Sequence, residues 1–253
     1  MGVIAILALC AAVVAAVPTN QRIVGGSVTT IEQYPSIVAL LDSFDLINFT
    51  QGCGGTILNN RSVLTAAHCV RANNMHRWRI RAGSTYANSG GTIYIIQEVF
   101  THPEYNLAAY VDFDFSIVRS ATVFAFSDKV RPVAIAGPNY NLEDNEPVYA
   151  AGWGFITEEG PSSEQLRHVQ VYTINQMACR LRMYGSVITD NMLCTGILDV
   201  GGKDQCYRDS GGPVYHHGVL VGVCSFGMGC ARPQYPGVNA RVSSAANWIV
   251  ANA

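Results

Sequence analysis

The chain has few charged residues and almost no lysine. Charged residues make up 13% of its 253 residues, and the formal net charge is −2 at pH 7. Proteins that bind nucleic acid or anionic membranes usually present a basic surface, so this balance argues against both partners. Of the 16 basic residues, only Lys129 and Lys203 are lysines. Arginine keeps its charge at a pH where lysine begins to lose it, so the bias favours an alkaline environment, with chance as the alternative.

The sequence also lacks low-complexity tracts and extended amphipathic helical patterns. Hydrophobic residues make up 49% of the chain, and 24 residues are glycine. This composition excludes a disordered chain and supplies enough apolar surface for a sizeable core. Short β-branched or aromatic runs alternate with glycine and proline turn signals, which predicts an all-β fold. The expected strands lie at residues 62–65, 92–99, 146–151, 170–174 and 219–226. One final helix is expected at about 243–253, capped by Ser243 or Ser244.

No apolar run beyond the first seventeen residues is long enough to cross a bilayer. Residues 2–17 carry no charge and include the small residues Ala15 and Ala16. This run is shorter than the roughly 20 residues that a membrane-spanning helix needs. We therefore predict a secretory signal peptide over residues 1–16, with a membrane anchor as the alternative.

The cysteines have no spacing typical of a metal site. Eight are present, and Cys10 lies in the expected signal peptide, so seven remain in the exported chain. None of them forms a C-x₂-C pair, and cysteines of exported proteins usually form disulfides. The odd number predicts one free thiol, and we expect neither a metal nor a cofactor. Two N-x-S/T sequons, at Asn48 and Asn60, leave glycosylation open.

Three short motifs carry the side chains that nucleophilic catalysis needs. His68 follows a strand-like run, Asp114 precedes an apolar segment, and Ser210 stands in Asp209-Ser210-Gly211-Gly212-Pro213, a sequence that favours an exposed turn. A serine hydroxyl is a weak nucleophile at neutral pH, so it needs a base such as histidine beside it. Each motif alone also has an ordinary explanation, as a core histidine, a strand-end acid or a turn.

The order His68, Asp114, Ser210 matches one of the known chain orders of the Ser-His-Asp triad. From Ile23 to the C-terminus the sequence resembles the trypsin-like branch of the chymotrypsin family, and in particular insect digestive trypsins. The resemblance implies two six-stranded antiparallel β-barrels, at about 35–130 and 131–242, followed by a C-terminal helix, with the active site in the cleft between the barrels. It implies a secreted, extracellular, monomeric endopeptidase of a digestive lumen. Its partners would be polypeptide substrates and protein inhibitors.

The same resemblance assigns roles to residues of this chain. It makes His68 the general base, Asp114 the acid that orients it, and Ser210 the nucleophile. The backbone N–H groups of Arg208 and Ser210 would form the oxyanion hole. Asp204 would lie at the floor of the primary pocket and pair with a substrate arginine or lysine. The other implied members of the substrate site are Ser225, Gly227 and Gly237.

The resemblance further implies an inactive precursor. Residues 17–22 would be the activation propeptide, and 23–253 the protease domain. Cleavage between Arg22 and Ile23 would free a new N-terminal ammonium that pairs with Asp209. The implied disulfides are Cys53–Cys69, Cys179–Cys194 and Cys206–Cys230, which leaves Cys224 as a buried free thiol.

Two residues before the serine depart from the family pattern. Tyr207 and Arg208 stand where glutamine and glycine are usual. Either the oxyanion hole is spoiled and the protein is an inactive, protein-binding relative, or activity survives while tight-binding protein inhibitors are rejected. We favour the second alternative because the triad, pocket and activation motifs are otherwise complete. Gln205 and Asn239 are departures as well, and they leave the preference between arginine and lysine open. A narrow regulatory protease is a further alternative to a digestive one.

Overall fold

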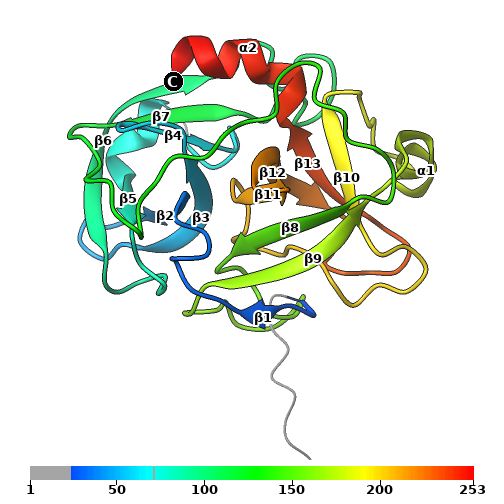
Figure 1. Ribbon diagram of the computed structural model, residues 1–253, viewed down its shortest axis with the longest axis horizontal. Coiled ribbons are helices and arrows are strands. Elements are labelled where there is room, and N and C mark those ends of the chain that lie inside the picture. The colour runs from blue at the N-terminus through cyan, green and yellow to red at the C-terminus, as the bar shows by residue number, and fades with distance from the viewer. Residues whose placement is uncertain (1–23, 71) are drawn as a thin grey trace, which may run out of the picture.

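The protein consists of two β-barrels that lie side by side. The structure is a computed structural model that describes residues 24–70 and 72–253. The expected signal peptide and propeptide, with Arg22 and Ile23, lie outside these residues. One barrel occupies the left and the other the right of Figure 1, and all their strand pairs are antiparallel. The expected all-β fold of two six-stranded barrels with a C-terminal helix is therefore confirmed.

The first barrel has the strand order β2-β3-β4-β7-β6-β5, and it closes where β5 pairs with β2. Its elements are β2 (Ile37–Asp42), β3 (Thr50–Ile57), β4 (Ser62–Thr65), β5 (Trp78–Ala82), β6 (Thr92–Thr101) and β7 (Ser116–Ser120), with the 3₁₀-helix η1 (Ala72–Arg77) before β5.

Strand β2 shows why the barrels pack against each other. Its residues 37–41 form a continuous apolar run, and all of them are buried. Successive side chains of a strand point to opposite faces. Val38 and Leu40 accordingly pack in one core cluster, whereas Ala39 packs in a second cluster with Trp153, which follows the first strand of the second barrel. The run is apolar throughout because both faces of the strand are covered.

The second barrel has the ring order β9-β10-β13-β12-β11-β8, closed by the pairing of β8 with β9. Its strands are β8 (Pro147–Gly152), β9 (Arg167–Thr173), β10 (Met192–Gly196), β11 (Pro213–His216), β12 (Val219–Gly227) and β13 (Gly237–Arg241). The short β1 (Ser27–Val28) pairs with β9 from outside the ring. The N-terminal part of the described chain is thus attached to the second barrel.

Helix α2 (Val242–Asn252) crosses the top of both barrels in Figure 1. Arg119 of β7 donates a hydrogen bond to the Asn252 carbonyl at 3.0 Å, so the helix end is tied to the first barrel. The expected serine cap is wrong, because Arg241 precedes the helix without a side-chain cap. The Ser244 hydroxyl instead donates to the Arg241 carbonyl at 2.8 Å.

One of the two α-helices among the described residues was not expected from the sequence. Helix α1 (Gln176–Arg182) is capped by the Asn175 side chain, which accepts hydrogen bonds from Met177 N and Ala178 N. With 7 residues it makes about two turns, which is too short for a clear helical period. Across residues 24–70 and 72–253, no helix combines the length and the apolar character needed to span a membrane.

Candidate active site

Paired strands of the first barrel bring His68 and Asp114 together. His68 follows β4 and Asp114 precedes β7, and these strands pair with Thr65 opposite Ser116. Asp114 Oδ2 lies 2.7 Å from His68 Nδ1, and Asp114 Oδ1 accepts the His68 backbone N–H at 3.0 Å. The carboxylate is fully buried, whereas 30% of the His68 side chain is exposed. Two bonds from one carboxylate fix the orientation of the ring and place its proton on Nδ1.

The second barrel contributes a third bond to the same carboxylate. Ser225, on β12, donates its hydroxyl to Asp114 Oδ2 at 2.5 Å. The carboxylate that orients His68 is therefore held from both barrels.

Backbone bonds hold Ser210 between the barrels. Its carbonyl accepts Gly54 N at 2.7 Å, and the following amide, Gly211 N, donates to the Cys224 carbonyl at 2.8 Å. Gly54 follows Cys53, which is bonded through its disulfide to the neighbour of His68. Cys224 precedes Ser225. The three predicted triad residues are thus joined in a ring of hydrogen bonds and covalent links.

The serine hydroxyl and the imidazole do not hydrogen-bond to each other in the described part of the chain. His68 Nε2 instead lies 3.8 Å from Cys69 Sγ. Catalytic hydrogen bonds are often long in unliganded enzymes and tighten when substrate binds. The structure therefore brings His68 and Asp114 into contact, but it shows no hydrogen bond between His68 and Ser210.

The backbone around Ser210 leaves two N–H groups unused. Asp209 N donates to the Cys206 carbonyl, and both Gly211 N and Gly212 N also have carbonyl acceptors. Within the described residues, Arg208 N and Ser210 N have none. They are the two groups that the resemblance assigns to the oxyanion hole.

Arg208 has an unusual backbone conformation. Its φ is +74°, in the left-handed region that glycine adopts without strain. Its guanidinium lies over the Phe155 ring, 5.8 Å from the centroid, and the Tyr207 ring contacts Phe155 edge-on. Tyr207 and Arg208, which replace the residues usual in the family, thus both contact the Phe155 ring.

Gln51 is a residue near the site that the sequence analysis missed. Its side chain is buried and donates from Nε2 to the Arg208 carbonyl at 2.7 Å and to the Cys53 carbonyl at 3.2 Å. These bonds help to hold the left-handed Arg208 in place. No local sequence signal indicates them, because a single glutamine in a strand is unremarkable.

A cavity of about 210 Å³ opens beside Ser210, and Asp204 is part of its lining. Asp204 is 4% exposed, and it accepts Gln205 N at 2.9 Å and Ala231 N at 3.2 Å. Burial raises the pKa of Asp204 to about 7, against the lowering effect of the two N–H bonds. A cation entering the cavity would favour the charged carboxylate. The predicted members Ser225, Gly227 and Gly237 line the same cavity.

Gly237 has no room for a side chain. A Cβ atom built there would lie 2.7 Å from Asp204 Oδ1. Gly237 therefore keeps the carboxylate open to the cavity.

Asp209 lies beneath the serine turn and is 1% exposed. Its oxygens accept Gly154 N at 2.7 Å and Cys206 N at 3.0 Å. Burial raises the pKa of Asp209 to about 6. Gly154 makes this burial possible, because a Cβ atom there would approach an Asp209 oxygen to 2.3 Å.

The structure contains the three disulfides that the resemblance implies, Cys53–Cys69, Cys179–Cys194 and Cys206–Cys230. Cys224 is free, as expected, but it is partly exposed and lines the cavity, so the expectation that this thiol is buried is corrected. Desolvation raises the pKa of this thiol well above its usual value. Among the described residues, no group of three or more His, Cys, Asp or Glu side chains could hold a metal.

Comparison with known proteins agrees with this architecture. The family model described as Trypsin matches residues 23–249. The chain is 60% identical over 252 residues to Trypsin, alkaline C, of Manduca sexta, with 98% of each chain covered. It is 56% identical over 253 residues to Trypsin CFT-1 of Choristoneura fumiferana, covering 99% of this chain and 98% of that one. It is 51% identical over 209 residues to Achelase-1 of Lonomia achelous, covering 80% of this chain and 95% of that one.

The double barrel is the chymotrypsin-like fold, which defines the class of the protein. The chain belongs to the trypsin family. Its activity is that of a trypsin-like serine endopeptidase, and its substrates are polypeptides.

Proposed function

We propose that Ser210, His68 and Asp114 cleave peptide bonds through an acyl-enzyme. Ser210 Oγ attacks the scissile carbonyl while His68 Nε2 takes its proton and later passes it to the leaving amine. Asp114 stabilises the imidazolium that forms. The observation that carries this proposal is the Asp114 carboxylate, fully buried and bonded to Nδ1 of a partly exposed histidine at 2.7 Å. The unused N–H groups of Arg208 and Ser210 support an oxyanion hole, where one donor contributes roughly 3–4 kcal/mol.

We infer that the enzyme cuts after arginine or lysine. A buried carboxylate in a cavity beside the nucleophile is complementary to a long cationic side chain. Asp204 supplies that carboxylate, and Gly237 leaves it accessible. The test is the residue preference of the wild-type enzyme and of an Asp204→Ser variant.

We infer that the protein is made as a zymogen and activated by cleavage between Arg22 and Ile23. Asp209 supports this inference, because among the described residues its buried oxygens accept only backbone N–H groups. The carbonyl of Val24, the residue after Ile23, accepts Asp204 N at 3.2 Å, and Asp204 stands five residues before Asp209 in the sequence. A new ammonium at Ile23 would give the buried acid a cationic partner and stabilise its charged form.

An Arg22→Gln precursor tests the activation step. We expect it to stay inactive after treatment with trypsin, because the new N-terminus cannot form, whereas the wild-type precursor becomes active. Mass spectrometry should find Ile23 at the N-terminus of the active form only. Equal activity of the two treated precursors would contradict a zymogen.

We further propose that Arg208 weakens tight-binding protein inhibitors. Its guanidinium is exposed beside the cleft and lies over Phe155, where a rigid inhibitor loop would have to displace it. Small substrates do not extend as far as the Arg208 guanidinium.

Replacing Arg208 with glycine should therefore strengthen inhibition by a tight-binding trypsin inhibitor by at least about tenfold, which is roughly 1.4 kcal/mol. Glycine keeps the backbone N–H and relieves the left-handed strain, so kcat/KM for a small arginine ester should change less than about twofold. The measurement is the inhibition constant of both forms, with Arg182→Gly as a matched control on α1. Equal constants would refute the proposal.

We place the enzyme in an alkaline digestive lumen as a secreted monomer. The scarcity of lysine supports the alkaline environment, as does the name of one relative, Trypsin, alkaline C, of Manduca sexta. An activity optimum near neutral pH would contradict the alkaline placement.

A further inference from the structure

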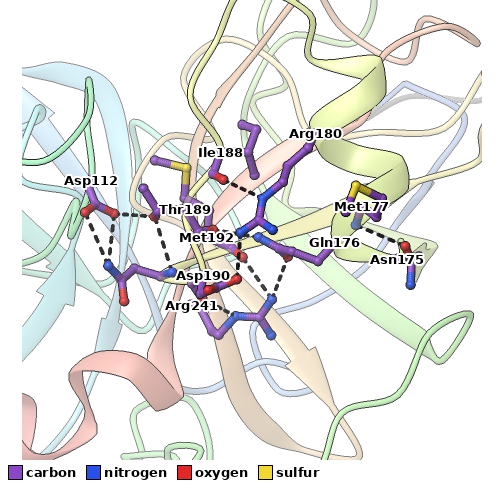
Figure 2. A network of polar contacts seen from close by, with 11 residues as sticks. Asp112, Asn175, Gln176, Met177, Arg180, Ile188, Thr189, Asp190, Met192 and Arg241 are labelled. Carbon is purple, nitrogen blue, oxygen red and sulfur yellow. Dashed lines mark hydrogen bonds and ion pairs between the residues drawn. The ribbon is translucent and has the colours of Figure 1, made fainter.

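Asp112 is a buried acid whose side chain, among the described residues, hydrogen-bonds to partners from the other barrel. It stands two residues before Asp114 and is 1% exposed. Thr189 Oγ1 donates to Asp112 Oδ1 at 2.6 Å, and Asn191 Nδ2 lies 3.3 Å and 3.2 Å from its two oxygens. Figure 2 shows Asp112 bonded to Thr189, which lies in the segment of the second barrel before β10. No ion pair to Asp112 is found among the described residues.

The backbone on both sides of Asp112 is in a conformation that side chains disfavour. Val111 has a φ of +52° and Phe113 a φ of +47°. Left-handed geometry is a marked outlier for a β-branched residue such as valine, and it persists only where surrounding contacts impose it. Two local hydrogen bonds help to impose this backbone conformation. Asn106 Oδ1 accepts Val111 N at 2.9 Å, and the Asp112 carbonyl accepts Asn106 N at 3.0 Å.

The segment that receives Asp112 is itself firmly held. Arg241 donates to the Asp190 carbonyl and to the Met192 carbonyl, both at 2.9 Å, and Arg180 donates to the Ile188 carbonyl at 2.9 Å (Figure 2). Residues 188–192 therefore present the Thr189 and Asn191 donors at fixed positions.

We propose that Asp112 is a positioning residue for catalysis. Its bonds to Thr189 and Asn191 anchor the left-handed turns at 111 and 113 on the second barrel. These turns set the path of the chain into Asp114, whose carboxylate must meet His68 Nδ1. The inference rests on the proposed roles of Asp114 and His68. It explains why two disfavoured conformations adjoin the candidate catalytic acid.

The test is an Asp112→Asn variant. Asparagine keeps the shape and the acceptor for Thr189, but its amide would face the Asn191 amide, donor against donor. Displacing a catalytic group by about an ångström can cost on the order of a hundredfold in rate. We expect kcat for an arginine amide to fall about ten- to a hundredfold while KM changes less than about twofold. The low-field proton NMR signal of His68 Nδ1–H should shift or broaden, which a distant structural defect would not cause.

Three further variants sharpen the test. Thr189→Val keeps its shape and removes one donor, so it should give a smaller fall in kcat, and it replaces Asp112→Asn if that variant does not fold. The double variant Asp112→Asn, Thr189→Val should be no slower than Asp112→Asn alone, because both changes break the same contact between Asp112 and residues 189–191. Asp190→Asn, whose carboxylate is exposed and bonded to Arg180, is the matched control and should behave as wild type.

A wild-type kcat and NMR signal in Asp112→Asn or, if that variant does not fold, in Thr189→Val would overturn the inference. Strictly additive losses in the double variant would do so as well. Activity that survives Ser210→Ala would instead overturn the proposed function itself, so the two failures are distinguishable.

Discussion

Replacing Ser210 with alanine is expected to lower kcat by about a millionfold, the order of loss known for the nucleophile of such triads. The variant keeps the cavity, the imidazole and the oxyanion donors, so it retains only the modest catalysis of binding and charge stabilisation. KM for a small arginine substrate should stay near the wild-type value. The measurement is steady-state hydrolysis of an arginine amide by activated protein of each form.

Ser244→Ala is the control for this experiment. Ser244 is an exposed serine on α2 whose hydroxyl bonds only locally to Arg241. It should leave kcat unchanged. A Ser210→Ala enzyme with more than a small fraction of wild-type activity would exclude the serine as nucleophile.

Asp204→Ser should have the second largest effect, on substrate choice. Removing the carboxylate leaves a buried substrate cation without its partner, which costs roughly 3–5 kcal/mol. That energy corresponds to a fall in kcat/KM for arginine substrates of roughly 100- to 5,000-fold. Because the triad is untouched, cleavage of a substrate with a small uncharged residue at that position should survive. The measurement is kcat/KM for a matched pair of substrates that differ only in this residue.

Two variants control the Asp204 experiment. Asp204→Asn keeps the shape of the carboxylate and should show most of the loss, which separates charge from packing. Asp199→Ser removes an exposed acid paired with Arg182 at the surface, and it should keep wild-type preference. An unchanged preference for arginine in Asp204→Ser would show that another group binds the cation.

The sequence predicted those parts of the fold that depend on local patterns. Runs such as 62–65 and 219–226 are strands because β-branched side chains pack well on a pleated surface. The C-terminal helix was placed within one residue of its observed bounds, although its cap was wrong, since Arg241 is held in extended backbone by β13. The short α1 escaped prediction because its stability comes from the Asn175 cap and the Cys179–Cys194 disulfide rather than from a repeating apolar face.

Some residues of the candidate site could likewise be predicted from local sequence patterns, and others could not. The serine turn and the histidine motif have signatures in adjacent residues, so they can be found in one sequence. Gln51 and Asp112 have none, because each acts through partners more than seventy residues away, at Arg208 and Thr189. The sequence also gives no sign of the left-handed backbone at Arg208, which is seen only once the chain is folded.

The central claim is that one serine forms a covalent intermediate beside a cation-binding cavity. Titration of the activated enzyme with a guanidino aryl ester tests it most directly, because acylation releases one aryl alcohol before slow deacylation. We expect a burst close to one equivalent per molecule and an acyl group on the peptide that contains Ser210. Absence of a burst, or an acyl group on Cys224 instead, would contradict the account.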